Sequence, residues 1–103
     1  MNFYDWNQIP EEQVNPLAKR QMIHGETMSV IRRQLAKGAV TRLHRHAEEQ
    51  ISMIERGKVR FTISGEEHVV STVQALAISP DALHSLEAIE DSVMVDLFAM
   101  PKS

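Results

Sequence analysis

Cysteine is absent from this 103-residue chain, which also has few aromatic residues and only four glycines. Without cysteine the chain can form neither a disulfide framework nor a thiolate metal site, so histidine, carboxylate and amide groups are the remaining metal ligands. No apolar run approaches the roughly eighteen residues that span a bilayer, so we expect no membrane partner. The formal net charge is only −3, which gives no electrostatic reason to expect nucleic-acid binding.

The remaining composition is typical of a soluble globular protein, with 43% hydrophobic and 24% charged residues. A chain of this length buries roughly two-thirds of its unfolded surface around one core, so we predict a single domain over residues 1–103. The first ten residues have neither a basic start nor an apolar stretch. We therefore expect no signal peptide and a cytoplasmic location.

Turn residues recur at short intervals, and the segments between them are rich in Val, Ile, Thr and Met. This pattern predicts an all-β fold of about ten short strands. The expected strands cover residues 17–24, 27–35, 40–46, 50–55, 58–63, 66–70, 75–78, 82–88 and 92–98. Because open sheet edges are prone to aggregation, so many strands in one small domain are expected to close into a barrel or a two-sheet sandwich.

A pair of histidines, His44 and His46, is followed four residues later by Gln50. On an extended strand, residues i and i+2 point to the same face with Cα atoms about 6.5 Å apart, so the two imidazoles can converge on one ion. A helical site would need a spacing of three or four residues. The spacing therefore predicts a metal site on a sheet, with Glu48 and Glu49 as rivals to Gln50 for the ion.

Alternation along the strand that starts at Gln50 predicts its two faces. If Gln50 points inward, Ser52 and Ile54 share its face while Ile51 and Met53 point outward. Two apolar residues on an outer face need cover, either from a second packed layer of this chain or from another copy. A homodimer fits both readings, and we expect one.

Two sequence motifs resemble those of the cupin family. The first consists of Gly38, His44, His46, Gln50 and Gly57, and it matches in every spacing, although a carboxylate usually occupies the place of Gln50. The second is the segment 78–85, Ile-Ser-Pro-Asp-Ala-Leu-His-Ser, which supplies His84. The resemblance implies a single-domain jelly-roll β-barrel that holds a divalent ion of nickel, zinc, manganese or iron. The implied ligands are His44, His46, Gln50 and His84.

Further segments, 19–24, 36–39 and 95–98 followed by Pro101, resemble the small cupins of pectin degradation. Those proteins convert 4,5-unsaturated monouronates, released by pectate and alginate lyases, into the linear keto form. The resemblance implies that Asp96 is the catalytic acid/base. It also puts Lys102 where those cupins have an arginine, and Lys102 would then contact the substrate carboxylate.

The donor set favours the same kind of substrate independently. Three imidazoles and one amide oxygen are all neutral, so a divalent ion among them keeps its whole charge and attracts an anion. We therefore expect a small anionic sugar or metabolite as partner. Asp96 is a lone carboxylate in an apolar strand, although a surface or edge position is the alternative. Arg33, between Ile31 and Leu35, could clamp a carboxylate from inside the barrel or point outward.

Weaker candidates are Arg20 and His24, which could reach the mouth of the barrel, and His68, which we expect to be an exposed strand residue. Three functions fit the pattern. The first is a metal-assisted isomerase of unsaturated uronates. The second is a non-haem iron dioxygenase, which uses histidine ligands and open coordination positions. The third is a cupin that binds a sugar or metabolite without turnover, and the fold does not choose among the three.

Overall fold

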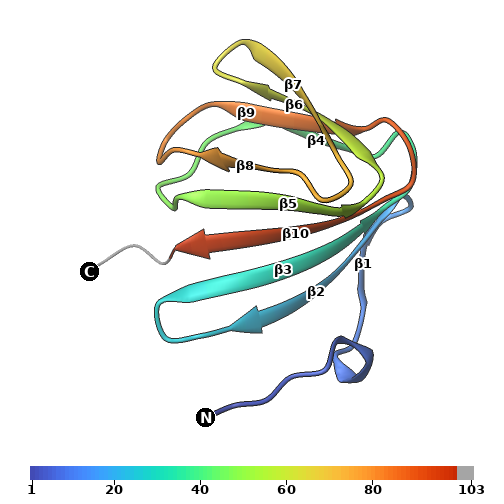
Figure 1. Cartoon of the computed structure of the whole chain (residues 1–103), viewed down its shortest axis with the longest axis vertical. Coiled ribbons are helices and arrows are strands. Elements are labelled where there is room, and N and C mark those ends of the chain that lie inside the picture. The colour runs from blue at the N-terminus through green and yellow to red at the C-terminus, as the bar shows by residue number, and fades with distance from the viewer. Residues whose placement is uncertain (100–103) are drawn as a thin grey trace.

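Ten β-strands and one short 3₁₀ turn make up the computed structural model, which describes residues 1–99 (Figure 1). The elements are η1 (Trp6–Gln8), β1 (Glu12–Asn15), β2 (Ala18–His24), β3 (Met28–Leu35), β4 (Val40–His44), β5 (Gln50–Arg56), β6 (Lys58–Ile63), β7 (Glu66–Ser71), β8 (Ala75–Ile78), β9 (His84–Ala88) and β10 (Ser92–Ala99). The described residues contain no α-helix. The predicted all-β class is confirmed.

The strands form two sheets with antiparallel pairing, as in a jelly roll (Figure 1). The six-stranded sheet has the order β1-β2-β3-β10-β5-β8, and the four-stranded sheet has the order β4-β9-β6-β7. Strand β10, close to the end of the described chain, pairs with both β3 and β5. Residues far apart in sequence therefore lie side by side across the larger sheet.

The space between the sheets changes character along its length. One part is an apolar core whose largest fully buried side chains include Ile54, Phe61 and Met94. Burial of each such side chain contributes about 2 kcal/mol to stability. Further along the same strands the buried side chains are polar, including Ser52, His84 and Asp96. The polar cluster therefore lies next to a packed apolar core.

Alternation in β5 follows the prediction. Gln50, Ser52 and Ile54 are buried, whereas Ile51 and Met53 are 40% and 36% exposed. Within residues 1–99, then, no second layer of this chain covers the two outward side chains.

Two strand boundaries differ from the prediction by two residues, the others differ by at most one, and one whole strand was not predicted. Strand β1 was not expected, because all four of its residues are exposed and show no alternation. Strand β4 ends at His44 rather than at residue 46, so His46 lies in the loop that follows. Strand β9 begins at His84 rather than at residue 82, after Asp81 turns the chain with a φ of 62°.

A tight turn at Gly57 joins β5 to β6. Gly57 has a φ of +106°, and a Cβ there would lie 2.6 Å from the carbonyl oxygen of Asp91 and 2.7 Å from the Cα of Ser92. Only glycine fits this backbone conformation and this close approach without strain. The turn therefore requires the glycine that the motif supplies.

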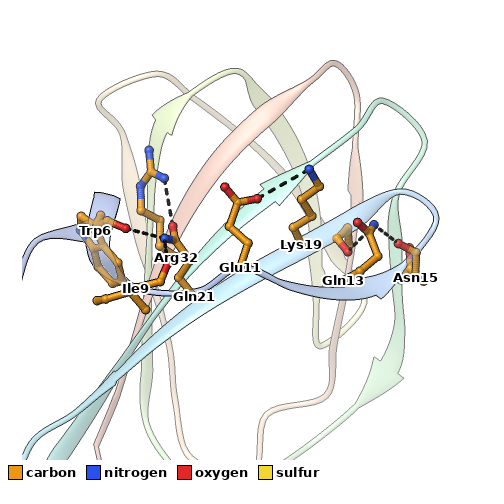
Figure 2. Close-up of polar contacts among 9 residues, drawn as sticks. Trp6, Ile9, Glu11, Gln13, Asn15, Lys19, Gln21 and Arg32 are labelled. Carbon is orange, nitrogen blue, oxygen red and sulfur yellow. Dashed lines mark hydrogen bonds and ion pairs between the residues drawn. The ribbon is translucent and has the colours of Figure 1, made fainter.

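The N-terminal segment is fastened to the outward side of β2 through Gln21 (Figure 2). The Gln21 Nε2 group donates hydrogen bonds of 2.7 Å and 2.8 Å to the carbonyl oxygens of Trp6 and Ile9. Arg32 donates to Gln21 Oε1 from the neighbouring strand. These contacts bury Gln21 on a face that strand alternation alone would leave exposed. No helix among residues 1–99 has the length and apolar character needed to cross a membrane.

Candidate metal centre

Three histidines from two distant segments of the chain meet between the sheets. His44 ends β4, His46 lies in the loop after it, and His84 begins β9 directly opposite His44. Their ring centroids are 4.2 Å apart for His44 and His84, 4.9 Å for His46 and His84, and 5.5 Å for His44 and His46. One nitrogen of each ring lies within 4.8 Å of the others, so the three could hold a metal ion.

Backbone carbonyls orient all three rings in the same way. The Nδ1 atoms of His44, His46 and His84 lie 2.8, 2.9 and 2.8 Å from the carbonyl oxygens of Arg42, Glu48 and Ala82. A carbonyl oxygen only accepts, so each Nδ1 carries a proton and donates it. In a neutral imidazole the lone pair is then on Nε2. Metal-binding histidines are commonly oriented by such a hydrogen bond on the other ring nitrogen.

The His84 imidazole is nearly inaccessible to solvent, and its Nε2 atom has no hydrogen-bond partner among residues 1–99. Burial lowers the pKa of His84, the neighbouring His44 and His46 lower it further, and the hydrogen bond to Ala82 opposes the shift. The ring is thus held as a neutral base with a buried, unpartnered lone pair, which costs about 1–3 kcal/mol. A divalent cation would satisfy that lone pair, so the donor set fits a metal.

Gln50 adds a fourth donor atom. Its side chain is buried, and Oε1 lies 3.1 Å from His46 Nε2. With the His46 proton on Nδ1, both atoms present lone pairs, and a shared cation would bring them together favourably. The rival carboxylates are less suitable, because Glu48 approaches His46 Nδ1 rather than Nε2 and Glu49 is exposed.

A hydrogen-bonded chain leads from Gln50 to a buried ion pair. Gln50 Nε2 donates to Ser52 Oγ at 2.9 Å, and Ser52 Oγ donates to Asp96 Oδ1 at 2.7 Å. Arg33 Nε donates to Asp96 Oδ2 at 2.8 Å. Asp96 is only 1% exposed, so the alternative of a surface aspartate is wrong. Arg33 points toward the interior and not outward from the strand.

These groups line one cavity of about 210 Å³. The three histidines, Gln50, Asp96 and Arg33 supply its polar lining, and Thr41, Leu86 and Phe98 complete it. The Phe98 ring lies 5.6 Å from the His46 ring. A small ligand here would contact the histidine nitrogens, a carboxylate and a guanidinium at once. The cavity thus combines the parts needed for Lewis-acid and acid/base chemistry.

The other sequence candidates lie elsewhere. Arg20 forms an exposed pair with Glu12, and His24 Nδ1 lies 2.8 Å from Ser29 Oγ at the end of β2. His68 is about half exposed and lies beside Glu66, as expected. Lys102 falls outside the described residues.

Sequence reasoning assigned no role to Ser52, Thr41, Leu86 or Phe98. The alternation of β5 put Ser52 on the same face as Gln50, but its hydrogen bonds depend on β10, which no local pattern reveals. Thr41 and Leu86 face each other across β4 and β9. Cross-strand register would have been needed to find them.

Comparison with known proteins identifies relatives of this fold. The cupin domain family matches residues 32–100. The pectin degradation protein KdgF of Dickeya dadantii (strain 3937) is 26% identical over 96 residues, which cover 90% of this chain and 87% of that protein. The structure of KdgF from Halomonas sp. superposes with a TM-score of 0.92 at 24% identity, covering 100% of this chain and 96% of that one. An RmlC-like cupin from Shewanella frigidimarina NCIMB 400 gives a TM-score of 0.91 at 20% identity, covering 100% and 94%.

Proposed function

Because this chain belongs to the cupin domain family, we propose that it is a metal-dependent isomerase that opens 4,5-unsaturated monouronates and converts them into their linear keto form. One observation carries the proposal. Four lone-pair donors and a buried, hydrogen-bonded carboxylate line the same small cavity. The similarity to a pectin degradation protein over most of the chain supports the choice of substrate.

In this proposal His44, His46, Gln50 and His84 hold one divalent ion of nickel, zinc, manganese or iron. Imidazole suits all of these metals except manganese, for which the amide oxygen is the better donor. When bound, the ion supplies Lewis-acid polarisation of a substrate oxygen, and its charge is not reduced by any ligand. An anionic substrate such as a uronate is favoured for that reason.

Asp96 acts as the general acid/base. A carboxylate oxygen has two lone pairs, so Asp96 can accept a substrate proton while still bonded to Ser52 and Arg33. It removes the proton from the anomeric hydroxyl, the C1–O5 bond breaks as the C1 carbonyl forms, and the electron pair passes to O5. The resulting enolate becomes a ketone at C5 when Asp96 returns the proton to C4. No atom is gained or lost, so the reaction is an isomerisation.

The remaining groups bind and shield the sugar. Arg33 keeps Asp96 in place and lines the cavity with its guanidinium, while Phe98 and Leu86 provide apolar surface against a sugar ring. Lys102, which matches the position of the arginine in the resembled cupins, is proposed to contact the substrate carboxylate. A single lysine makes that contact as a point charge rather than as a bidentate fork.

Loss of the ultraviolet absorbance of the conjugated double bond tests the proposal directly. The substrate is the monouronate obtained by exhaustive lyase digestion of pectate, and the protein is loaded in turn with each candidate metal. We expect faster decay with the protein, and a loss of about 10²-fold or more with Asp96→Asn. Glu87→Gln is the matched control, since Glu87 pairs with Arg60 on the exposed side of β9.

Decay no faster than without protein, or full activity in Asp96→Asn, would contradict the isomerase. Binding of the sugar without loss of the double bond would instead assign the site to recognition. Oxygen consumption that depends on added iron would favour a dioxygenase.

We also propose that two copies associate through the outward face of the six-stranded sheet. The exposed Ile51 and Met53 of β5 lie opposite Leu97 and Val95 of β10, so the apolar surface is continuous across strands. Contiguous apolar surface is what protein–protein interfaces bury, which supports this face as the contact between copies.

Charge at the border of this apolar face favours a second copy over another partner. Arg32 and Glu55 form an ion pair of 2.9 Å at the same face. A two-fold axis brings each residue of a patch against its own patch on the partner, so a border that carries both signs is self-complementary.

A further inference from the structure

The hydrogen bonds behind Gln50 run in one direction only. Arg33 and Ser52 donate to Asp96, and Gln50 donates to Ser52. A guanidinium can only donate and a carboxylate can only accept. Ser52 therefore donates its single hydroxyl proton to Asp96. Toward Gln50, the Ser52 Oγ atom can only accept a hydrogen bond. Gln50 must present its NH₂ group to Ser52.

That requirement fixes the other end of the amide. With Nε2 toward Ser52, the Gln50 Oε1 atom faces His46 Nε2 and the histidine cluster. Rotation of the carboxamide by 180° would set Oε1 against a hydroxyl oxygen that has no proton to give. It would also turn the NH₂ group, which cannot bind a cation, toward the proposed metal position.

Burial makes the penalty for the wrong orientation large. Ser52 is 0%, Asp96 1% and Gln50 4% exposed, so solvent does not replace a lost partner. A buried donor or acceptor without a partner costs about 1–3 kcal/mol, and the low local dielectric strengthens the bonds that are made. The chain of donors thus selects one of the two amide orientations.

We propose that Ser52 is a positioning residue that turns Gln50 into a metal ligand by holding its amide oxygen toward the histidines. An amide has one end that binds a cation and one that does not, whereas a carboxylate offers oxygen from both ends. Ser52 is therefore needed specifically because residue 50 is glutamine. The inference rests on the metal centre of the proposed function, but not on the isomerase reaction.

A double-mutant cycle on metal affinity isolates this role. Dissociation constants for nickel, zinc and manganese are measured by calorimetry for the wild type, Ser52→Ala, Gln50→Glu and the double variant. We expect Ser52→Ala to weaken binding by about 10–100-fold in the wild-type background, as for other residues that orient a metal ligand. In the Gln50→Glu background the same change should alter affinity by less than about threefold, because a carboxylate needs no such orientation.

Ile54→Val is the packing control, since Ile54 is buried on the same face of β5 and contacts no donor of the cluster through a hydrogen bond. It should reduce stability but leave metal affinity unchanged. Equal losses from Ser52→Ala in both backgrounds, or no loss in the wild type, would overturn the inference. Failure of the wild type to bind any of the three ions, or iron(II) measured in the same way without oxygen, would overturn the metal centre and this inference with it. Absence of isomerase activity alone would leave the predicted coupling intact.

Discussion

Arg33 and Asp96 form an ion pair of 2.8 Å between two diagonally placed residues of the adjacent strands β3 and β10. The carboxylate is almost fully buried, while a quarter of the Arg33 side chain is exposed. The main partner of the Arg33 guanidinium is therefore Asp96. A ligand in the cavity would be a second partner. Its position explains how a charged residue is tolerated inside the barrel.

Removing Arg33 is expected to destabilise the fold. Arg33→Met leaves the buried Asp96 carboxylate without its cation, which should lower the free energy of unfolding by about 1–3 kcal/mol, less than for a fully buried pair. Denaturant unfolding measures the change. The double variant Arg33→Met/Asp96→Asn should recover part of the loss, because the unpaired charge is then gone. Additive losses in the double variant would show that the two residues are not energetically coupled.

Metal binding should stabilise the folded protein. An ion that binds only the native state at one hundred times its dissociation constant raises the free energy of unfolding by about 2.7 kcal/mol. For a domain of this size that corresponds to a rise of about 10 °C or more in Tm. Thermal unfolding with and without nickel, zinc or manganese measures the shift, which a chelator should reverse.

The histidine variants localise that effect. His84→Asn should abolish the metal-induced rise in Tm, while His68→Asn, a matched change at an exposed strand position, should retain it. An equal rise in both variants would place the ion elsewhere.

Much of the fold could be predicted from the sequence because turn residues and alternation are local signals. Nine of the ten strands lie where the pattern put them, within a few residues at their ends. Strand β1 carried no such signal, since it has no buried face and is held by pairing with β2. His46 was expected on a strand because its spacing from His44 suits one. The chain leaves β4 between the two residues, and the rings still converge.

Less of the candidate site could be predicted from local sequence patterns. The alternation of β3 and β10 could place Arg33 and Asp96 on inward faces, but their pairing joins residues 63 positions apart. The approach of His84 to His44 depends on the register of β4 against β9. Only the family resemblance could bring these distant residues together from sequence, and it gave no role to Ser52.

We expect the apolar outer face of the six-stranded sheet to hold the proposed dimer together. Met53→Glu would bury a charge at the two-fold interface of the proposed dimer, so we expect a monomer by size-exclusion chromatography with light scattering. Val69→Glu is the matched control, because Val69 is an exposed valine on β7 of the other sheet. A wild type that is monomeric at high concentration, or dissociation by the control alone, would contradict this arrangement.

The neutrality of the donor set makes a prediction about the substrate's charge. Gln50→Glu places a carboxylate in the centre, which should tighten metal binding yet cancel part of the cation's charge toward the ligand. At an effective dielectric constant of about 20, a charge change at contact distance is worth up to about 4 kcal/mol, so even partial cancellation should raise KM for an anionic sugar by about tenfold or more.

Gln74→Glu is the control for this change. It adds the same charge in a surface turn and keeps the oxygen that accepts from the Ser71 amide. Steady-state kinetics on the metal-loaded proteins should show the rise in KM for Gln50→Glu only. If both variants keep the KM of the wild type, the neutral ligand set has no part in attracting the anion, and Gln50 serves the metal alone.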